Sequence, residues 1–118
     1  MKRAWFGGLA AALCAMASPC WAGPAVASRY QIADMPQQQC LERAEAAVKQ
    51  IYDRANKPES ERKIDRTEQS RYGTYGSYTG VVRCVTENKI VVFIGSGPER
   101  GSADGLAGRL FENWTAAK

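Results

Sequence analysis

The chain has 118 residues, with 16 basic side chains against 12 acidic ones and no histidine. A chain of this length has room for one small domain with a modest core. Without histidine there is no Ser–His or Cys–His nucleophile pair, no histidine-based zinc site and no imidazole for acid–base chemistry near neutral pH. The basic residues are not gathered into one run, and we therefore expect no nucleic-acid partner.

The N-terminal segment, residues 1–22, has the features of a cleavable secretory signal peptide. Two basic residues precede an apolar run over residues 4–17, and small residues stand at the −3 and −1 positions of a cleavage site after Ala22. The run is shorter than the ~20 apolar residues that span a bilayer. We predict that the mature chain, residues 23–118, is periplasmic or secreted and is not stably inserted in a membrane. Its formal charge falls from +4 to +2, because two basic residues leave with the signal.

Signal cleavage would remove two of the four cysteines and leave Cys40 and Cys84. In an oxidising compartment a disulfide between them is the expected state, and two buried free thiols are the alternative. The bridge would close a loop of about 45 residues and stabilise the fold by roughly 4 kcal/mol in the chain-entropy model. With both thiols paired, thiolate catalysis is excluded as well.

The mature chain is expected to begin with a mobile stretch over residues 23–29. A weak period-two pattern through residues 26–32 indicates a short strand. An amphipathic helix is predicted over residues 35–56, where apolar residues recur at spacings of three and four. Asp34 is its expected N-cap, and Gln37 is expected to complete a capping box.

The segment 59–71 carries four acidic and four basic residues but only one apolar side chain, Ile64. It is predicted to be a solvated helix or a mobile loop, because one apolar residue cannot hold it by packing. Residues 72–80 repeat tyrosine at every third position, with glycine after the first two. That glycine density excludes a helix and indicates a loop that leads into a strand.

A β-hairpin is predicted from strands over residues 78–86 and 90–94, joined by a tight turn. The second strand is apolar on both faces, which is typical of a central position. The inner face of the first strand would carry Tyr78, Val82 and Cys84. The residues expected on the outer face are Val81, Val85, Val91 and Phe93. That face would need a cover: the segment 57–72, a second copy or a partner.

A glycine-rich connection over residues 95–101 leads into a last helix, for which Ser102 is the expected N-cap. The apolar stripe of this helix comprises Ala103, Leu106, Ala107, Leu110, Phe111 and Trp114. The connection has the strand-to-helix arrangement of a phosphate-binding loop. However, Arg100 replaces the third glycine of the dinucleotide fingerprint, and Pro98 removes a backbone N–H. A plain turn is therefore favoured.

These elements predict an α+β fold of two layers, an antiparallel, hairpin-centred sheet with two amphipathic helices on one face. The predicted order is helix, strand, strand, helix, with a short strand in front. The Cys40–Cys84 disulfide would join the first helix to the inner face of the hairpin, because Cys84 shares that face with Val82.

The C-terminal part of the chain carries a compound pattern: a tyrosine, a basic residue before a cysteine, an apolar strand and a Gly-Pro pair ahead of a helix. Its residues are Tyr78, Arg83, Cys84, 90–93, Gly97 and Pro98. Together with the helix-borne Cys40, this pattern resembles a group of small uncharacterised secreted proteins of proteobacteria. The resemblance implies a periplasmic location and a disulfide. It brings no activity and transfers no functional residue.

No residue set in the sequence forms a catalytic, cofactor-binding or metal-binding motif. We therefore expect a protein that is not an enzyme and that uses no cofactor or metal. The candidate interface is the tyrosine-rich edge of the hairpin with its neighbouring arginines, because tyrosine supplies rigid contact area with a polar tip. The candidate residues are Arg71, Tyr72, Tyr75, Arg83 and Phe93.

Three functional hypotheses remain at this point. The first is a non-catalytic periplasmic binding protein whose partner is another protein, as for an inhibitor or immunity factor. The second is a structural homodimer of the cell envelope, joined through the outer face of the sheet. The third and least favoured is an enzyme, whose candidate groups would be the carboxylates within residues 59–68.

Overall fold

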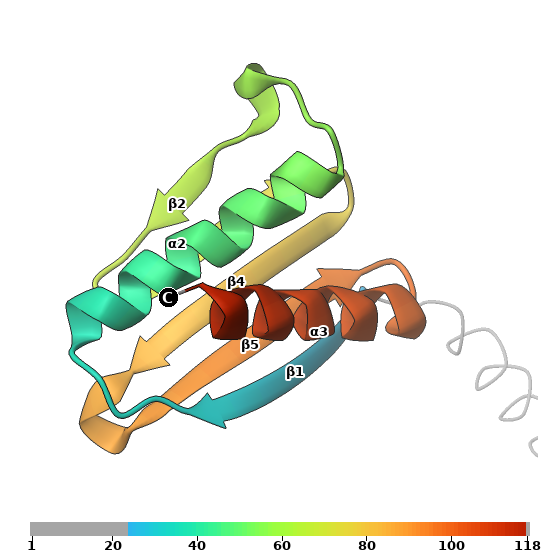
Figure 1. The fold of residues 1–118 in the computed structure, drawn as a ribbon. Coiled ribbons are helices and arrows are strands. Elements are labelled where there is room, and N and C mark those ends of the chain that lie inside the picture. Colours follow the sequence, from blue (N-terminus) through green and yellow to red (C-terminus); the bar gives the residue numbers. More distant parts are fainter. Residues whose placement is uncertain (1–23, 118) are drawn as a thin grey trace, which may run out of the picture.

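The computed structural model describes residues 24–117, and the predicted signal peptide lies outside the described residues. Five strands form one antiparallel sheet in the order β1-β5-β4-β3-β2 (Figure 1). The elements are β1 (Ala25–Ile32), α2 (Gln37–Arg54), the 3₁₀ turn η2 (Glu59–Glu61), β2 (Ile64–Arg66), β3 (Ser70–Tyr75), β4 (Tyr78–Val85), the 3₁₀ turn η3 (Thr86–Asn88), β5 (Ile90–Gly97) and α3 (Arg100–Ala116).

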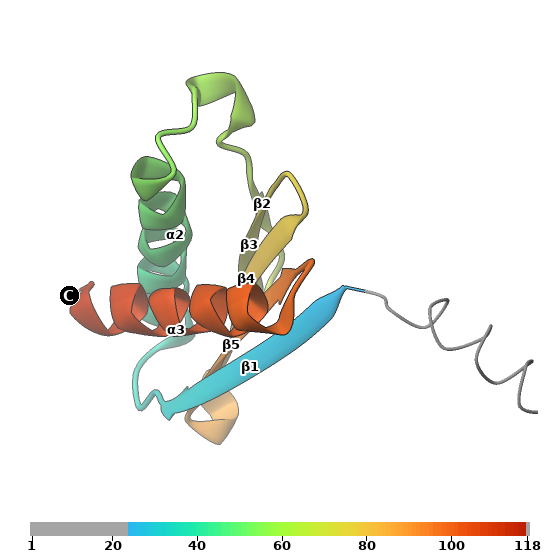
Figure 2. The same cartoon turned by 90° about the vertical axis from the view of Figure 1, so that its right-hand side faces the viewer.

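Both helices lie on the same face of the sheet (Figure 2). α2 packs on β3 and β4, α3 packs on β5 and β1, and the two helices contact one another. The predicted α+β class and the placement of the helices on one face are therefore confirmed. The sheet has five strands. Beyond the predicted hairpin it contains β1, β2 and β3, and of these only β1 was expected, as a short strand before the first helix.

The core lies between the helices and the inner face of the sheet, where alternate strand residues are buried. In β4, Val82 and Cys84 are fully buried, whereas Arg83 between them is exposed. The predicted faces of this strand are confirmed. The largest fully buried side chains are Trp114, Tyr52, Phe93, Leu110, Val82 and Val91.

The prediction that Val91 and Phe93 line the outer face is wrong. In the register of β4 and β5, Val82 pairs with Phe93 and Cys84 with Val91, so all four side chains point to the helices. Both Val91 and Phe93 are completely buried, and the Phe93 ring makes edge contacts with Trp114. A strand that is apolar on both faces does not reveal which residues face inward, because the length of the turn before it decides the parity.

Three glycines stand side by side across the inner face, because Gly73 pairs with Gly80 and Gly80 pairs with Gly95. The helices approach the sheet closely at the two ends of this row. A Cβ on Gly95 would overlap the carbonyl oxygen of Ala103 in α3, and a Cβ on Gly73 would overlap the hydroxyl of Tyr52 in α2. Gly95 and Gly97 at the end of β5 therefore allow α3 to pack closely on the sheet. The connection from β5 to α3 is a short turn.

The segment that was predicted to be a solvated helix or a mobile loop instead forms η2, β2 and the start of β3. Contacts from α2 hold it in place: the Tyr52 hydroxyl donates to the Lys63 carbonyl at 2.7 Å, and the Arg66 Nε donates to the Glu45 carboxylate at 2.6 Å. β2 pairs with β3 and adds one strand to the edge of the sheet. The segment 57–72 therefore does not cover the outer face.

The helices begin differently from their predicted caps. The N-cap of α2 is Pro36, with no side-chain hydrogen bond, so Asp34 does not cap it. α3 begins at Arg100 after Glu99, and the Ser102 hydroxyl donates back to the Glu99 carbonyl at 2.8 Å. Both predicted N-caps are wrong, because the N-cap positions are occupied by Pro36 and Glu99, neither of which makes a side-chain capping hydrogen bond.

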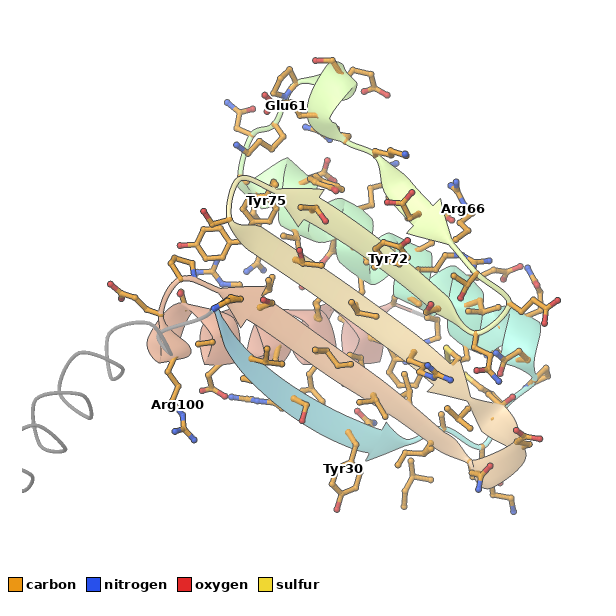
Figure 3. The ribbon with its side chains drawn as sticks, turned by 180° about the vertical axis from the view of Figure 1, so that it is seen from behind. Tyr30, Glu61, Arg66, Tyr72, Tyr75 and Arg100 are labelled. Atoms are coloured by element: carbon orange, nitrogen blue, oxygen red, sulfur yellow. A yellow bond between two sulfur atoms is a disulfide. The ribbon has the colours of Figure 1, made fainter. Side chains whose placement is uncertain are left out.

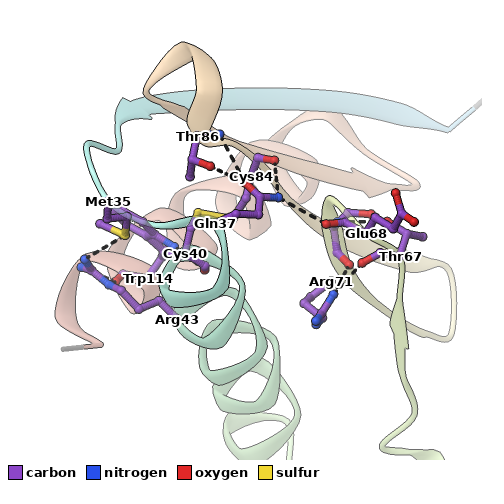
Figure 4. Close-up of a disulfide and its surroundings, with 11 residues drawn as sticks. Met35, Gln37, Cys40, Arg43, Thr67, Glu68, Arg71, Cys84, Thr86 and Trp114 are labelled. Carbon is purple, nitrogen blue, oxygen red and sulfur yellow. Dashed lines mark hydrogen bonds between the residues drawn. A yellow bond between two sulfur atoms is a disulfide. The ribbon is translucent and has the colours of Figure 1, made fainter.

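The predicted Cys40–Cys84 disulfide is present and joins α2 to β4 (Figure 4). Gln37, one turn before Cys40, makes a second connection beside it. Its amide donates to the Cys84 carbonyl at 3.0 Å and accepts from the Thr86 hydroxyl at 2.6 Å. The start of α2 is thus fixed to the end of β4 and the start of η3 by the disulfide and by three hydrogen bonds of Gln37, one of which the Thr86 backbone N–H donates. Gln37 serves this connection instead of a capping box.

Candidate interaction surface

The face of the sheet that is turned away from the helices is bare in the described part of the chain (Figure 3). Alternate residues of four strands point to it, and most of them are apolar. We define the outer patch as Tyr30 and Ile32 of β1, Ile90, Val92 and Ile94 of β5, Val81 and Val85 of β4, and Tyr72 of β3. The sequence predicted an uncovered outer face but misassigned half of the residues it named there.

The outer patch is most exposed along β1. Tyr30 is 71% exposed and Ile32 is 74% exposed, and Val26 in the same row is 64% exposed. The outer-patch residues of β4 and β5 are partly buried, because all of them except Val85 have a cross-strand neighbour on both sides. β1 is an edge strand, so its outward-facing apolar side chains have a neighbouring strand, β5, on one side only.

One charged side chain, Arg83, stands among the apolar residues of the outer patch, between Val81 and Val85 along β4 and opposite Val92 of β5. Arg83 is exposed, lies between Val92 and Ser70 in the register, and donates to the Gln69 side chain at 2.7 Å. Within residues 24–117 it has no carboxylate at ion-pair distance. An apolar surface that includes an arginine is typical of protein–protein contacts, in which arginine is enriched.

The five predicted interface residues do not form one surface. Tyr72 and Arg83 lie on the outer face, where Tyr72 belongs to the outer patch and Arg83 stands opposite Val92 of that patch. Arg71 and Tyr75 point to the helix side, and Phe93 is completely buried in the core. The contribution of Phe93 to an interface is therefore excluded by its burial, and the predicted cluster divides between the two faces of the sheet.

Arg71 belongs to a structural cluster with Glu45 and Arg66. The Glu45 carboxylate accepts a hydrogen bond from Arg66 and lies 3.5 Å from the Arg71 Nε. The Arg66 hydrogen bond is the main reason that the pKa of Glu45 lies below its usual range, and the charges of both arginines act in the same direction. Arg71 also donates to the Thr67 carbonyl at 2.8 Å. Its side chain holds the β2–β3 hairpin against α2 and is not available to a partner.

Tyr75 is also occupied by contacts within the fold. Its ring stacks on Tyr78 with a centroid distance of 5.3 Å and meets the edge of Tyr52 at 6.1 Å. The ammonium group of Lys57 lies 5.6 Å from the ring centroid. Burial raises the pKa of the Tyr75 hydroxyl above its ordinary value. Of Tyr72 and Tyr75, only Tyr72 therefore faces a potential partner.

Sequence reasoning missed Tyr30 and Ile32, which are the most exposed members of the outer patch. The period-two pattern in residues 26–32 was a usable signal, because it places Val26, Tyr30 and Ile32 on one side of a strand. What the pattern does not reveal is that this strand joins the sheet next to β5, which turns the row to the outer face.

The described residues show no arrangement suited to metal or membrane chemistry. No three His, Cys, Asp or Glu side chains within residues 24–117 lie close enough together to hold a metal ion. None of the helices in this range is long and apolar enough to cross a bilayer. Comparisons with known proteins find no matching family model, no matching curated protein and no matching solved structure.

Proposed function

We propose that the mature chain is a non-catalytic binding protein of the periplasm or the extracellular space, and that its partner is another protein, as for an inhibitor or an immunity factor. The observation that carries this proposal is the outer patch, an apolar sheet face that neither helix covers. Contiguous apolar patches of this kind on small proteins usually mark interaction sites.

The size of the face supports a protein partner over a small ligand. Three strands of eight residues and one of six, about 4.8 Å apart with a rise of about 3.3 Å per residue, present roughly 500 Å² of flat surface. A standard protein–protein interface buries about 800 Å² on each partner. The outer patch and its polar rim are of this order, whereas a small ligand would need a concave pocket.

The face is also held rigidly, which favours binding because little conformational entropy is lost on association. The Cys40–Cys84 disulfide fixes α2 to the sheet from behind, and the close packing of α3 on Gly95 fixes the central strand. A small disulfide-bonded protein with a predicted export signal fits an oxidising compartment.

The test introduces a negative charge on the outer patch at a position where the fold can accept it. Val92 stands opposite Arg83 in the register, so Val92→Glu places a carboxylate beside a guanidinium while removing an apolar side chain from the centre of the face. Gln50→Glu introduces the same charge on the exposed side of α2 and is the matched control.

Tagged protein comprising residues 23–118 would be used to capture partners from a periplasmic extract, and the captured protein would then be purified and titrated. We expect one partner that binds with 1:1 stoichiometry to the wild type and to Gln50→Glu, and at least about tenfold more weakly to Val92→Glu, since core interface residues carry most of the binding energy. Equal affinity of all three proteins, or the absence of any stoichiometric partner, would overturn the proposal.

A further inference from the structure

The two edges of the sheet differ in how they are protected. β2 forms one edge with three residues, Ile64–Arg66, and charged side chains at Asp65 and Arg66. β1 forms the other edge with eight residues, Ala25–Ile32, and Arg29 is its only charged residue. Long edge strands without lysine, proline or bulges are the ones that pair with another strand.

The single charge on β1 does not guard the edge, because it is directed to the helix side. Arg29 pairs with Phe93 in the register, which places its side chain on the inner face. There the guanidinium lies 3.5 Å from the Asp104 carboxylate of α3 and against Gly108. Gln31, on the same face, accepts a hydrogen bond from Thr115 at 2.9 Å. α3 thus holds β1 from the inner side and leaves its edge open.

The direction of the free backbone groups follows from the end of the β1–β5 ladder. Ala33 N–H donates to the Lys89 carbonyl at 2.8 Å, and these two residues continue the register by one pair. Odd-numbered residues of β1 therefore direct their N–H and C=O groups toward β5. In an antiparallel ladder the alternate residues point the opposite way. Val26, Ser28, Tyr30 and Ile32 consequently present their backbone donors and acceptors to the open edge.

These same four residues include the three most exposed large apolar side chains in residues 24–117, Val26, Tyr30 and Ile32. A strand added to the edge would satisfy their backbone groups and cover the open side of their side chains together. The added strand must be apolar at alternate positions on the outer face, and β1 itself has that pattern.

We propose that two copies of this chain pair through antiparallel β1 strands, with Ser28 on the two-fold axis. In this register Val26 stands opposite Tyr30 of the second copy, and Arg29 stands opposite Ala27, so no like charges meet. Ser28 faces Ser28 as a hydrogen-bonded pair. The contact is isologous and closes as a dimer. The two sheets then form one continuous sheet of ten strands, and their outer patches merge into one surface.

The pairing uses the edge of β1, whereas the proposed partner binding uses the outer face, so the two proposals can fail separately. The test requires only residues 23–118 and no partner. Sedimentation would be measured up to about 1 mM, a range that detects even a weak dimer. We expect a concentration-dependent shift from monomer to dimer for the wild type and for Ser28→Ala.

Ser28→Pro is the decisive variant, because it removes one N–H that points to the open edge and none that bonds β5. Proline is tolerated on an edge strand when its nitrogen faces solvent. We expect an unchanged far-UV CD spectrum and a dimerisation constant at least about tenfold weaker than that of Ser28→Ala. A wild-type protein that stays monomeric throughout, or a Ser28→Pro protein that dimerises as well as Ser28→Ala, would overturn the proposal.

Cross-linking tests the register. Opposite Cα atoms of a hydrogen-bonded antiparallel pair lie about 5.5 Å apart, within the range of about 4.4–6.8 Å that a disulfide spans. Ser28→Cys should therefore give covalent dimers under oxidation. Ser70→Cys, on the outer face of the interior strand β3, is the matched control and should give few. Equal cross-linking of the two variants would show that the contact does not lie at β1.

Discussion

Gly95 of β5 lies directly against the backbone of Ala103 in α3, with no space for a side chain between them. A Cβ at Gly95 would also lie 2.7 Å from the Ala107 amide nitrogen. The obstructing atoms belong to a helix backbone and cannot rotate away. We therefore expect Gly95→Ala to destabilise the protein by about 2 kcal/mol or more through overpacking, measured by urea unfolding of residues 23–118.

The same substitution in α3 supplies the control. Gly105 is exposed in the helix, and a Cβ there would meet no atom within 4 Å. Gly105→Ala should stabilise the protein by about 0.5–1 kcal/mol, because alanine has the higher helix propensity and a less flexible unfolded chain. Changes of the same sign in both variants would contradict the close approach of α3 to β5.

The Cys40–Cys84 disulfide closes a loop with a sequence separation of 44 residues. Replacing both cysteines by alanine should lower the free energy of unfolding by about 2–4 kcal/mol, mainly because the unfolded chain regains its freedom. The comparison is between wild type and the double variant in urea, with and without a reductant. Both cysteines are disulfide-bonded and fully buried, so the wild type should react with Ellman's reagent only after unfolding and reduction. Two reactive thiols in the unreduced, unfolded protein would contradict the bridge.

Arg43 of α2 stabilises the C-terminal end of α3. Its guanidinium donates to the Trp114 carbonyl at 2.9 and 3.1 Å and to the Thr115 carbonyl at 3.1 Å, and it lies 3.9 Å from the centroid of the Trp114 ring. These are carbonyls that a helix end leaves without partners, and the positive charge complements the helix dipole. Arg43→Met keeps the apolar stem and removes the donors.

We expect Arg43→Met to lose about 1.5–3 kcal/mol of stability, the usual contribution of hydrogen bonds to a charged group. The stability of Arg43→Lys should lie between that of Arg43→Met and that of the wild type, because an ammonium group cannot reproduce the fork of guanidinium donors. Trp114 is the only tryptophan in residues 23–118, so its fluorescence reports the unfolding of α3 directly. An Arg43→Met protein as stable as wild type would show that the capping contact contributes nothing.

The two helices and the β4–β5 hairpin were predictable, because each carries its own periodicity. In α2 the apolar residues from Leu41 to Tyr52 recur every three or four positions, and this repeat alone specifies which side is buried. In β4 the alternation of Val82, Arg83 and Cys84 does the same with a period of two. Local side-chain patterns were sufficient to predict an element and its buried face wherever one face is buried and the other is exposed to solvent.

β2 and β3 could not be predicted in this way, since Arg66, Arg71 and Gly73 at their inner positions interrupt the apolar alternation. Gly73 sits inward because the Tyr52 hydroxyl occupies the space of a side chain there, and Arg71 sits inward because Glu45 receives it. Both reasons lie on another element, 20 or more residues away along the chain. The candidate surface was misread for a related reason: the faces of Phe93 and Tyr75 depend on strand pairing, which periodicity does not specify.

Residues of the outer patch on β1 should contribute little to stability, because most of their surface is exposed. Ile32 is 74% exposed, so Ile32→Thr retains a β-branched side chain and should change the free energy of unfolding by no more than about 0.5 kcal/mol. Val91→Thr, at a fully buried position of the neighbouring strand, is the matched control and should lose about 1–3 kcal/mol by burying a hydroxyl. Equal losses in the two variants would mean that the outer face is covered within the chain.

The Glu45 cluster makes stability depend on pH in acid. The hydrogen bond from Arg66 holds the pKa of Glu45 below its unfolded value, so the folded state binds the ionised form better. This stabilisation is fully present above the unfolded pKa of about 4.3 and is lost as the pH falls through the lower folded pKa. Because the Glu45 side chain is 39% exposed, solvent screening limits the effect to about 0.5–1 kcal/mol.

Glu45→Gln should therefore be less stable than wild type at neutral pH by about this amount, and the difference should disappear in strong acid. Glu42→Gln, on an exposed position of the same helix without an ion pair in residues 24–117, is the control and should follow the wild-type curve. The measurement is the urea midpoint as a function of pH for all three proteins. High salt should reduce the gap between Glu45→Gln and wild type, because the ion pairs are partly exposed. A gap that persists unchanged in strong acid would show that Glu45 acts through packing rather than through its charge.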